Sequence, residues 1–174
     1  MEASSENAAG PTESLESVQG HDHASEHQGY IDVSAQLEDN QSWWRFTGIY
    51  GAPDISQRVD TWRLLTRLHA QSTRDWLCAG DFNEILDRSE KSGGPPRLNW
   101  QMRNFRTALT ECGLSDIGFT GSPFTWINRH ASPYTVYERL DRACANRGGR
   151  SCFQMLRSHI SQSIALIILL SLFV

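Results

Sequence analysis

The feature that most limits how this chain can fold is a short apolar run that ends in glycine, residues 76–80 (Trp-Leu-Cys-Ala-Gly). A run of this length and composition predicts a buried strand. A helix is expected before it, over residues 56–70, because apolar side chains recur there at a spacing of three. The apolar positions of this helix are Val59, Trp62, Leu65 and Leu68.

Further elements alternate along the chain. Aromatic and β-branched residues predict strands at residues 30–33, 43–50, 124–127 and 137–141. The turn signal Asp39-Asn40 separates the first two, which predicts a hairpin. A second helix is expected after Asn99, which is its candidate N-cap residue, and should end near Gly113. Because strands and helices alternate loosely, the predicted class is α/β or α+β.

Charge divides the chain into two parts. Residues 1–40 contain nine acidic residues and no Lys or Arg, whereas the remainder contains 11 acidic and 16 basic residues. The mildly basic remainder is compatible with a polyanionic partner. Fifteen of the 16 basic residues are Arg, which suits phosphate contacts, although codon bias would explain the same count.

The first residues differ from the rest in composition. Residues 1–29 are rich in Ser, Glu, Gly, Ala and His, and after Met1 they lack Phe, Trp, Tyr, Ile and Met. Such a segment buries too little apolar surface to order itself, so a disordered acidic tail is predicted.

The sequence also indicates a compartment. No secretory signal is visible. The four cysteines lack CxxC spacing, which argues against a zinc site and a disulfide scaffold and favours a reducing compartment. The expected location is therefore nuclear or cytoplasmic.

The residues that follow the buried strand indicate chemistry. Asp81 and Asn83 emerge two positions apart after Gly80, so in an extended chain both side chains point to one side. The carboxyl ends of strands are where open α/β sheets keep their sites. A carboxylate there can move a proton or help to hold a metal, and an amide can orient a phosphate or a water. The alternative is a surface turn, because Gly-Asp-x-Asn is ordinary loop composition.

From Tyr30 to Asn146 the sequence resembles the endonuclease/exonuclease/phosphatase family, and within it the apurinic-type endonuclease domain of plant LINE-type (non-LTR) retroelements. The matching segments occur in the family's order, and they are residues 44–53, 76–86, 90–94, 101–106, 114–119, 121–126 and 138–142. The resemblance implies part of a four-layer α/β sandwich, in which helices flank two β-sheets. It also implies Mg²⁺-dependent phosphodiester hydrolysis, with DNA as the substrate nicked by a reverse transcriptase-associated domain.

The resemblance assigns roles to four residues. Tyr50 matches the family's tyrosine that contacts the scissile phosphate, and Asp81 matches the aspartate that activates water or protonates the leaving group. Asn83 matches the asparagine that holds the phosphate or water, and Asp141 matches the aspartate that orients a catalytic histidine. Asp81 and Asn83 are also the expected metal contacts. The alternatives are a core-facing tyrosine and a salt-bridged strand aspartate.

Two parts of the family's site have no counterpart in the sequence. Residues 1–29 contain nothing that resembles the family's opening-strand Asn or metal-binding Glu, and no Ser-Asp-His motif follows Asn146. The partial family domain is therefore expected at residues 30–146, followed by a divergent tail at 147–174. With permitted codons, residues 164–173 encode Arg-Ser-Asp-His when they are read from the third base. We therefore hypothesise a frameshift or misplaced splice junction, which the genomic DNA would test.

The apolar end of that tail is not expected to cross a membrane. Residues 164–174 would form a helix of about 16 Å, whereas the hydrocarbon core is about 30 Å thick. Three hypotheses about function remain: a Mg²⁺-dependent nuclease with impaired catalysis, a non-catalytic remnant or binding piece, and a phosphatase of the same fold. No specific protein partner can be inferred.

Overall fold

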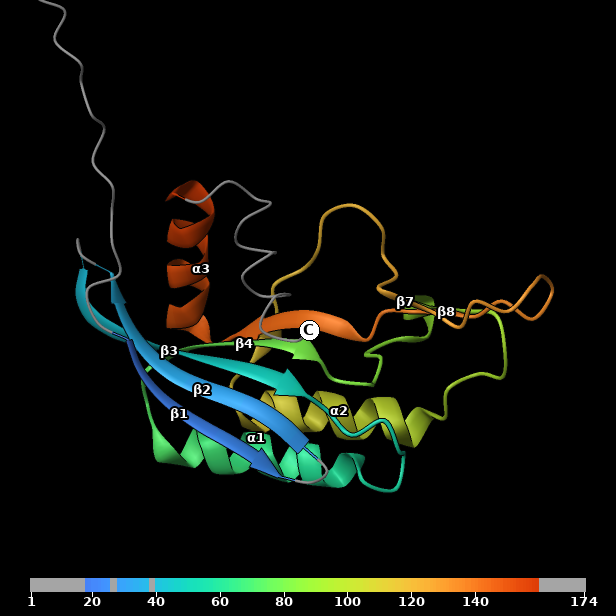
Figure 1. Cartoon of the computed structure of the whole chain (residues 1–174), viewed down its shortest axis with the longest axis horizontal. Helices are drawn as coiled ribbons and strands as arrows, with labels where there is room; N and C mark the ends of the chain where they lie inside the picture. Colours follow the sequence, from blue (N-terminus) through green and yellow to red (C-terminus); the bar gives the residue numbers. More distant parts are fainter. Residues whose placement is uncertain (1–17, 26–27, 38–39, 160–174) are drawn as a thin grey trace, which may run out of the picture.

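The computed structural model describes residues 18–25, 28–37 and 40–159. Its main sheet has six strands in the order β1-β2-β3-β4-β9-β6. These strands are β1 (Val18–Ser25), β2 (Gln28–Leu37), β3 (Asn40–Tyr50), β4 (Asp75–Asp81), β9 (Asp141–Ala145) and β6 (Ser115–Asp116). Helices α1 (Arg58–Gln71) and α2 (Asn99–Glu111) cover one face of this sheet, and α3 (Arg147–His159) lies on the other (Figure 1).

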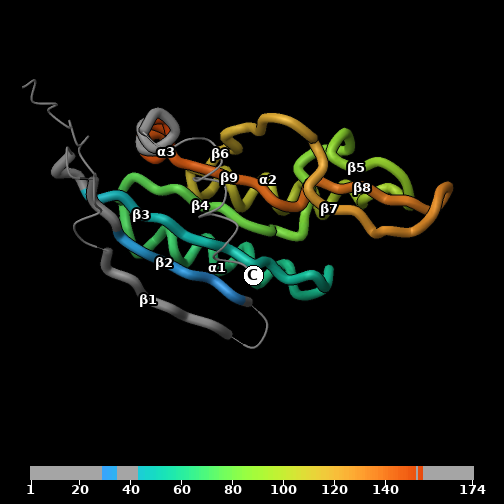
Figure 2. The backbone as a smooth tube through the Cα atoms, turned by 45° about the horizontal axis from the view of Figure 1, so that its top comes forward, coloured from blue at the N-terminus to red at the C-terminus, as the bar shows by residue number. Residues whose placement is uncertain are grey.

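A second, smaller sheet has three strands in the order β5-β8-β7. They are β5 (Lys91–Ser92), β8 (Tyr137–Glu138) and β7 (Trp126–Ile127), and the short helix η1 (Arg88–Glu90) precedes β5. This sheet lies at the end of the molecule opposite α3 (Figure 2). The chain is thus a mixed α/β protein with two sheets flanked by helices, which confirms the predicted class.

The apolar run at residues 76–80 forms the centre of β4, which is buried on both faces. Trp76 and Cys78 pack with α1 and α2, whereas Leu77 and Ala79 face the side that carries α3. β4 lies parallel to β3, and helix α1 connects the two strands. A strand covered on both faces needs apolar side chains at consecutive positions, which explains why this run shows no alternation.

Both predicted helices pack apolar side chains against the sheet, although the predicted apolar position Val59 is 44% exposed. The indole of Trp62 on α1 stacks on Phe105 of α2 with ring centroids 4.6 Å apart, and Phe82 contacts the same ring at 5.3 Å. Leu65 and Phe105 are completely buried. Helix α1 begins two residues later than expected. The N-cap residue of α2 is Leu98 and not Asn99, which is the first residue of the helix.

The structure differs from the expectation of a disordered tail over residues 1–29. Residues 18–25 form β1, which pairs antiparallel with β2 from Gln28 onward. The composition argument concerned burial of side chains, but β1 is held by backbone hydrogen bonds to the edge of β2, to which side-chain polarity is no barrier. Residues 1–17 lie outside the described residues.

Two predicted strands are shorter or divided. The predicted strand at residues 124–127 is reduced to β7, and the one at 137–141 becomes β8 and the start of β9. The division falls at Leu140, whose carbonyl accepts a hydrogen bond from Phe82 N at 3.0 Å instead of a ladder bond. The predicted tail from residue 147 begins with helix α3. Residues 160–174, on which the frameshift hypothesis rests, lie outside the described residues.

Gly80 provides a stability prediction, because its φ is 141° and a Cβ there would lie 2.0 Å from the carbonyl oxygen of Ile49. We expect Gly80→Ala to lower the free energy of unfolding by about 2 kcal/mol or more in urea denaturation. Gly113→Ala is the control, because Gly113 also has a positive φ of 64° but open space around it. Equal losses in the two variants would contradict the importance of the clash.

Candidate active site

Three of the four predicted site residues are terminal residues of neighbouring strands in the main sheet. Tyr50 ends β3 and is the register partner of Asp81 at the end of β4, and Asp81 is the register partner of Asp141 at the start of β9. Aligned residues on adjacent strands share a face, so the three side chains form a row on one face of the sheet. We call Tyr50, Asp81 and Asp141 the site row.

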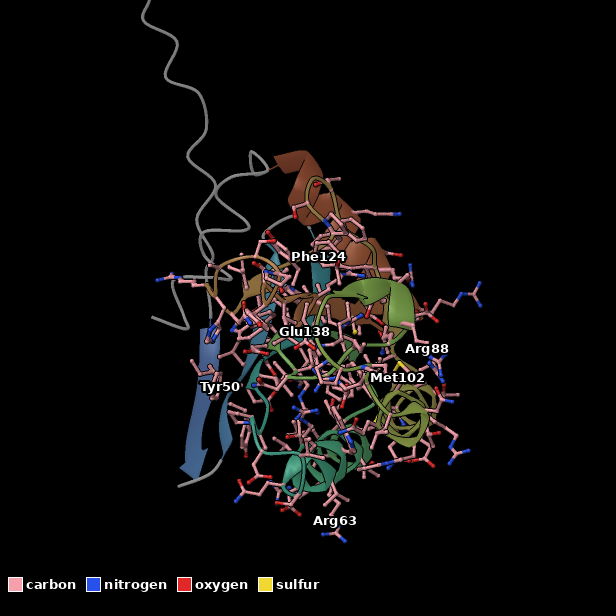
Figure 3. All side chains as sticks on the ribbon, turned by 90° about the vertical axis from the view of Figure 1, so that its right-hand side faces the viewer. Tyr50, Arg63, Arg88, Met102, Phe124 and Glu138 are labelled. Atoms are coloured by element: carbon pink, nitrogen blue, oxygen red, sulfur yellow. The ribbon has the colours of Figure 1, made fainter. Side chains whose placement is uncertain are left out.

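The site row lies on the face of the sheet opposite α1 and α2. Along β4, Leu77 and Ala79 share the face of Asp81, because side chains alternate, and both belong to the cluster that packs with α3. Figure 3 shows Tyr50 on the side of the molecule away from Arg63 of α1 and Met102 of α2. Tyr50 is 46% exposed, so the alternative of a core-facing tyrosine does not hold.

Asn83 reaches the site by a turn, so of the two alternatives for residues 81–83 the turn holds and the extended chain does not. Its φ is 54°, and its backbone N–H donates to Asp81 Oδ1 at 2.7 Å. Its side-chain Nδ2 donates to the carbonyl of Gly51 at 2.8 Å. These two hydrogen bonds join Asn83 both to Asp81 and to the loop that follows Tyr50. The second N–H of the amide and its Oδ1 remain for a ligand.

Electrostatics distinguish Asp81 from an ordinary surface carboxylate. Burial, together with the nearby charge of Asp141, raises the pKa of Asp81 from 3.8 to about 6. The backbone N–H of Asn83 and the charge of Arg58 act in the opposite direction. A carboxyl group with a pKa near neutrality can both take and give a proton under ordinary conditions. Asp81 is therefore suited to acid–base chemistry.

Hydrogen bonds to the backbone fix the position of Asp141. The hydroxyl oxygen of Thr125 accepts hydrogen bonds from Leu140 N and Asp141 N, each at 3.0 Å. Within the described part of the chain, no Lys or Arg forms a salt bridge with Asp141, which removes the alternative of a salt-bridged strand aspartate. Thr125 was not identified from the sequence, where one threonine between two aromatic residues gives no signal.

The donors in the site row fit a hard cation only in part. Among residues 18–25, 28–37 and 40–159, no group of three or more His, Cys, Asp and Glu side chains could hold a metal ion. Asp81 and Asp141 do supply two carboxylates on one face. Mg²⁺ is commonly bound by one or two carboxylates, with waters and substrate phosphates as its other ligands. Two carboxylates are a donor set that a divalent cation could share with a phosphate, and the row does not form an all-protein cage.

The family's catalytic histidine has no described counterpart beside Asp141. His130 is exposed in the connection between β7 and β8, and His159 is the last residue of α3. Glu84, which follows Asn83 in the sequence, is not free to bind a metal ion either. Arg58 and Arg97 form salt bridges with it at 2.7 and 3.2 Å.

The sequence profile of the endonuclease/exonuclease/phosphatase family matches residues 8–156. The chain belongs to this family. The match extends beyond residues 30–146 at both ends.

Among curated proteins, no sequence matches the chain. Within the described residues, no helix is both long and apolar enough to cross a bilayer.

Solved structures share this endonuclease/exonuclease/phosphatase fold. The endonuclease domain of TRAS1, a telomere-specific non-LTR retrotransposon, aligns with a TM-score of 0.56 and 12% identity over 75% of this chain and 56% of that domain. A β-hairpin deletion mutant of the Staphylococcus aureus beta toxin aligns with a TM-score of 0.51 and 14% identity over 78% of this chain and 52% of the toxin. At these identities the likeness shows the fold alone, and the chain spans about half the length of these structures.

Proposed function

We propose that this chain is a retroelement-derived DNA endonuclease domain, of the plant LINE type, with a Mg²⁺-dependent phosphodiesterase site whose catalysis is impaired. The observation that carries the proposal is the site row, in which Tyr50, Asp81 and Asp141 align in register on adjacent strands. Membership of the family and the fold shared with the TRAS1 endonuclease domain support it. DNA as substrate agrees with the nuclear or cytoplasmic location predicted from the sequence.

Each residue has a part in phosphodiester hydrolysis. The exposed Tyr50 hydroxyl donates a hydrogen bond to a non-bridging phosphate oxygen, and the free N–H of Asn83 donates to the same group. Asp81, with its pKa of about 6, exchanges a proton with the attacking water or the leaving oxygen. Asp81 and Asp141, with Asn83 Oδ1 as a further contact, would hold Mg²⁺, and the ion would supply neutralisation of the phosphate charge.

The proposed impairment rests on the described surroundings of Asp141. Asp141 has no described histidine to orient, so Asp81 must carry the proton transfers alone. A positioned general acid or base contributes about 10²- to 10⁴-fold to a rate, so we expect slow nicking rather than none. The non-catalytic binding remnant is the second candidate, because the described residues supply no histidine partner for Asp141.

A plasmid assay tests the proposal. Supercoiled plasmid incubated with the chain and Mg²⁺ should be nicked slowly, and EDTA or Asp81→Ala should abolish the nicking. Asp60→Ala is the matched control, because Asp60 is an exposed acid whose partner Arg63 is also exposed, and this variant should nick as the parent does. Plasmid binding without nicking would instead establish the binding remnant. Hydrolysis of inositol phosphates without nicking would establish the phosphatase.

A further inference from the structure

Arg58 lies in the first turn of α1 and is buried although it is charged. Its Nη1 donates to Glu84 Oε2 at 2.7 Å, its Nη2 donates to the carbonyl of Pro53 at 3.0 Å, and its Nε donates to the carbonyl of Ala52 at 3.4 Å. Ala52 and Pro53 follow β3, whereas Glu84 follows β4. One guanidinium therefore joins the two loops that leave the parallel strands.

Glu84 forms the other half of this contact. Its side chain is 1% exposed, and its Oε1 accepts a hydrogen bond from Ile85 N at 3.0 Å and lies 3.2 Å from Arg97 Nε. A carboxylate with this many donors is fixed in position, so Arg58 is anchored on a rigid partner.

The same two loops carry the reacting groups. Tyr50 lies two residues before Ala52, and Asn83 lies immediately before Glu84. The loops also contact each other directly, because Gly51 N donates to the carbonyl of Asp81 at 2.7 Å and Asn83 Nδ2 donates to the carbonyl of Gly51 at 2.8 Å. A change in the separation of the loops therefore changes the positions of Tyr50 and Asn83 relative to Asp81.

We propose that Arg58 is a positioning residue, which sets the separation of Tyr50 from Asp81 and Asn83 by holding both loops from beneath the site. The role in catalysis rests on the proposed nuclease function. Arg58 acts through the two loops in this proposal, because three of its five N–H groups donate within the protein and its side chain is buried.

The geometry requires arginine rather than lysine. A guanidinium presents its N–H groups in a fixed planar fork, so it can bond a carboxylate and two carbonyls in different directions at once. An ammonium group keeps the charge but is a single compact centre. Misplacement of reacting groups by about 1 Å costs on the order of 100-fold in rate. Lysine at this position should therefore preserve the fold and lose rate.

Plasmid nicking by the full chain measures the effect. Arg58→Lys should lower kcat by about 10- to 100-fold and leave KM within about threefold of the parent value. Glu84→Gln, which keeps the shape but removes the charge, should lower kcat in the same way. Arg63→Lys is the control on the same helix, because the Arg63 side chain is 74% exposed, and it should match the parent. An unchanged kcat in Arg58→Lys, or an effect on KM alone, would overturn the proposal.

An NMR measurement keeps the inference separate from the nuclease proposal. The side-chain amide resonances of Asn83 report its hydrogen bond to Gly51, whether or not the chain cuts DNA. We expect them to shift in Arg58→Lys and Glu84→Gln and to stay in place in Arg63→Lys. A parent that does not nick plasmid would refute the nuclease proposal only, whereas unshifted Asn83 resonances would refute the positioning role. If Arg58→Lys does not melt cooperatively, Glu84→Gln decides the outcome.

Discussion

Replacing Arg142 by methionine should lower the free energy of unfolding by about 3–5 kcal/mol, the usual loss when one partner of a buried ion pair is removed. The Arg142 side chain is 0% exposed, and its guanidinium lies 2.8 Å from Glu90 and 2.9 Å from Asp116. It also donates to the carbonyl of Arg139 at 2.9 Å. Methionine would fill the space but carry no charge. Of the two arginines that pair with Glu90 and Asp116, only Arg139 would remain.

Urea denaturation followed by circular dichroism measures this loss, with Arg63→Met as the control. The exposed Arg63–Asp60 pair should contribute less than about 1 kcal/mol. If both variants lose the same amount, the buried network does not stabilise the fold beyond an ordinary surface pair.

The loss should depend on pH with a defined sign. Burial opposes ionisation of Glu90, but its hydrogen bond to Arg142 and the charge of that guanidinium hold the pKa of this carboxyl below its usual 4.5. A lowered folded-state pKa gives stability above the unfolded pKa, and this stability is lost as the pH falls through the folded value. The difference between parent and Arg142→Met should therefore be full at pH 7 and should shrink below about pH 4.5.

The elements that the sequence predicted correctly are those with a local cause. Strand β4 and helices α1 and α2 follow from apolar side chains a few positions apart, and the register of β3, β4 and β9 then aligns Tyr50, Asp81 and Asp141. The resemblance identified those three residues, and the strand pairing explains why they meet. Their catalytic roles and the metal contact stay predictions.

The remaining features depend on partners far apart in the sequence. Arg58 and Glu84 are separated by 26 positions, and Arg142 and Glu90 by 52. No periodicity marks such pairs, so Arg58 and Glu84 looked like ordinary helix and loop charges. The turn at Asn83 was one of two alternatives that the sequence left open, and the side-chain hydrogen bond that accompanies it joins Asn83 to Gly51, 32 positions away.

Asp81→Asn should change activity and stability in opposite directions. Asparagine keeps the size of the side chain and an oxygen that can accept the hydrogen bond from Asn83 N, but it cannot exchange a proton or carry a negative charge. We expect plasmid nicking to fall by about 10³-fold, because acid–base transfer and one metal ligand are lost together.

The same change should stabilise the fold at neutral pH. Because the pKa of Asp81 rises from 3.8 in the unfolded chain to about 6 in the folded one, the folded state binds more protons between these values. Stability of the parent therefore decreases as the pH rises through this window, and the decrease is complete above pH 6. A shift of this size corresponds to at most about 3 kcal/mol, and partial solvent access to the site reduces the expected gain to about 1–2 kcal/mol.

Urea denaturation at pH 4 and pH 7.5 separates this effect from a general change in packing. The parent and Asp81→Asn should have similar stability at pH 4, where the parent carboxyl is largely protonated in the folded state, and the variant should be more stable at pH 7.5. Added Mg²⁺ should stabilise the parent more than the variant, since binding to the native state alone shifts unfolding. A variant that is less stable than the parent at pH 7.5 would contradict the raised pKa. A carboxyl group whose charged form costs stability is common at functional sites, so this trade-off would support the proposed role of Asp81.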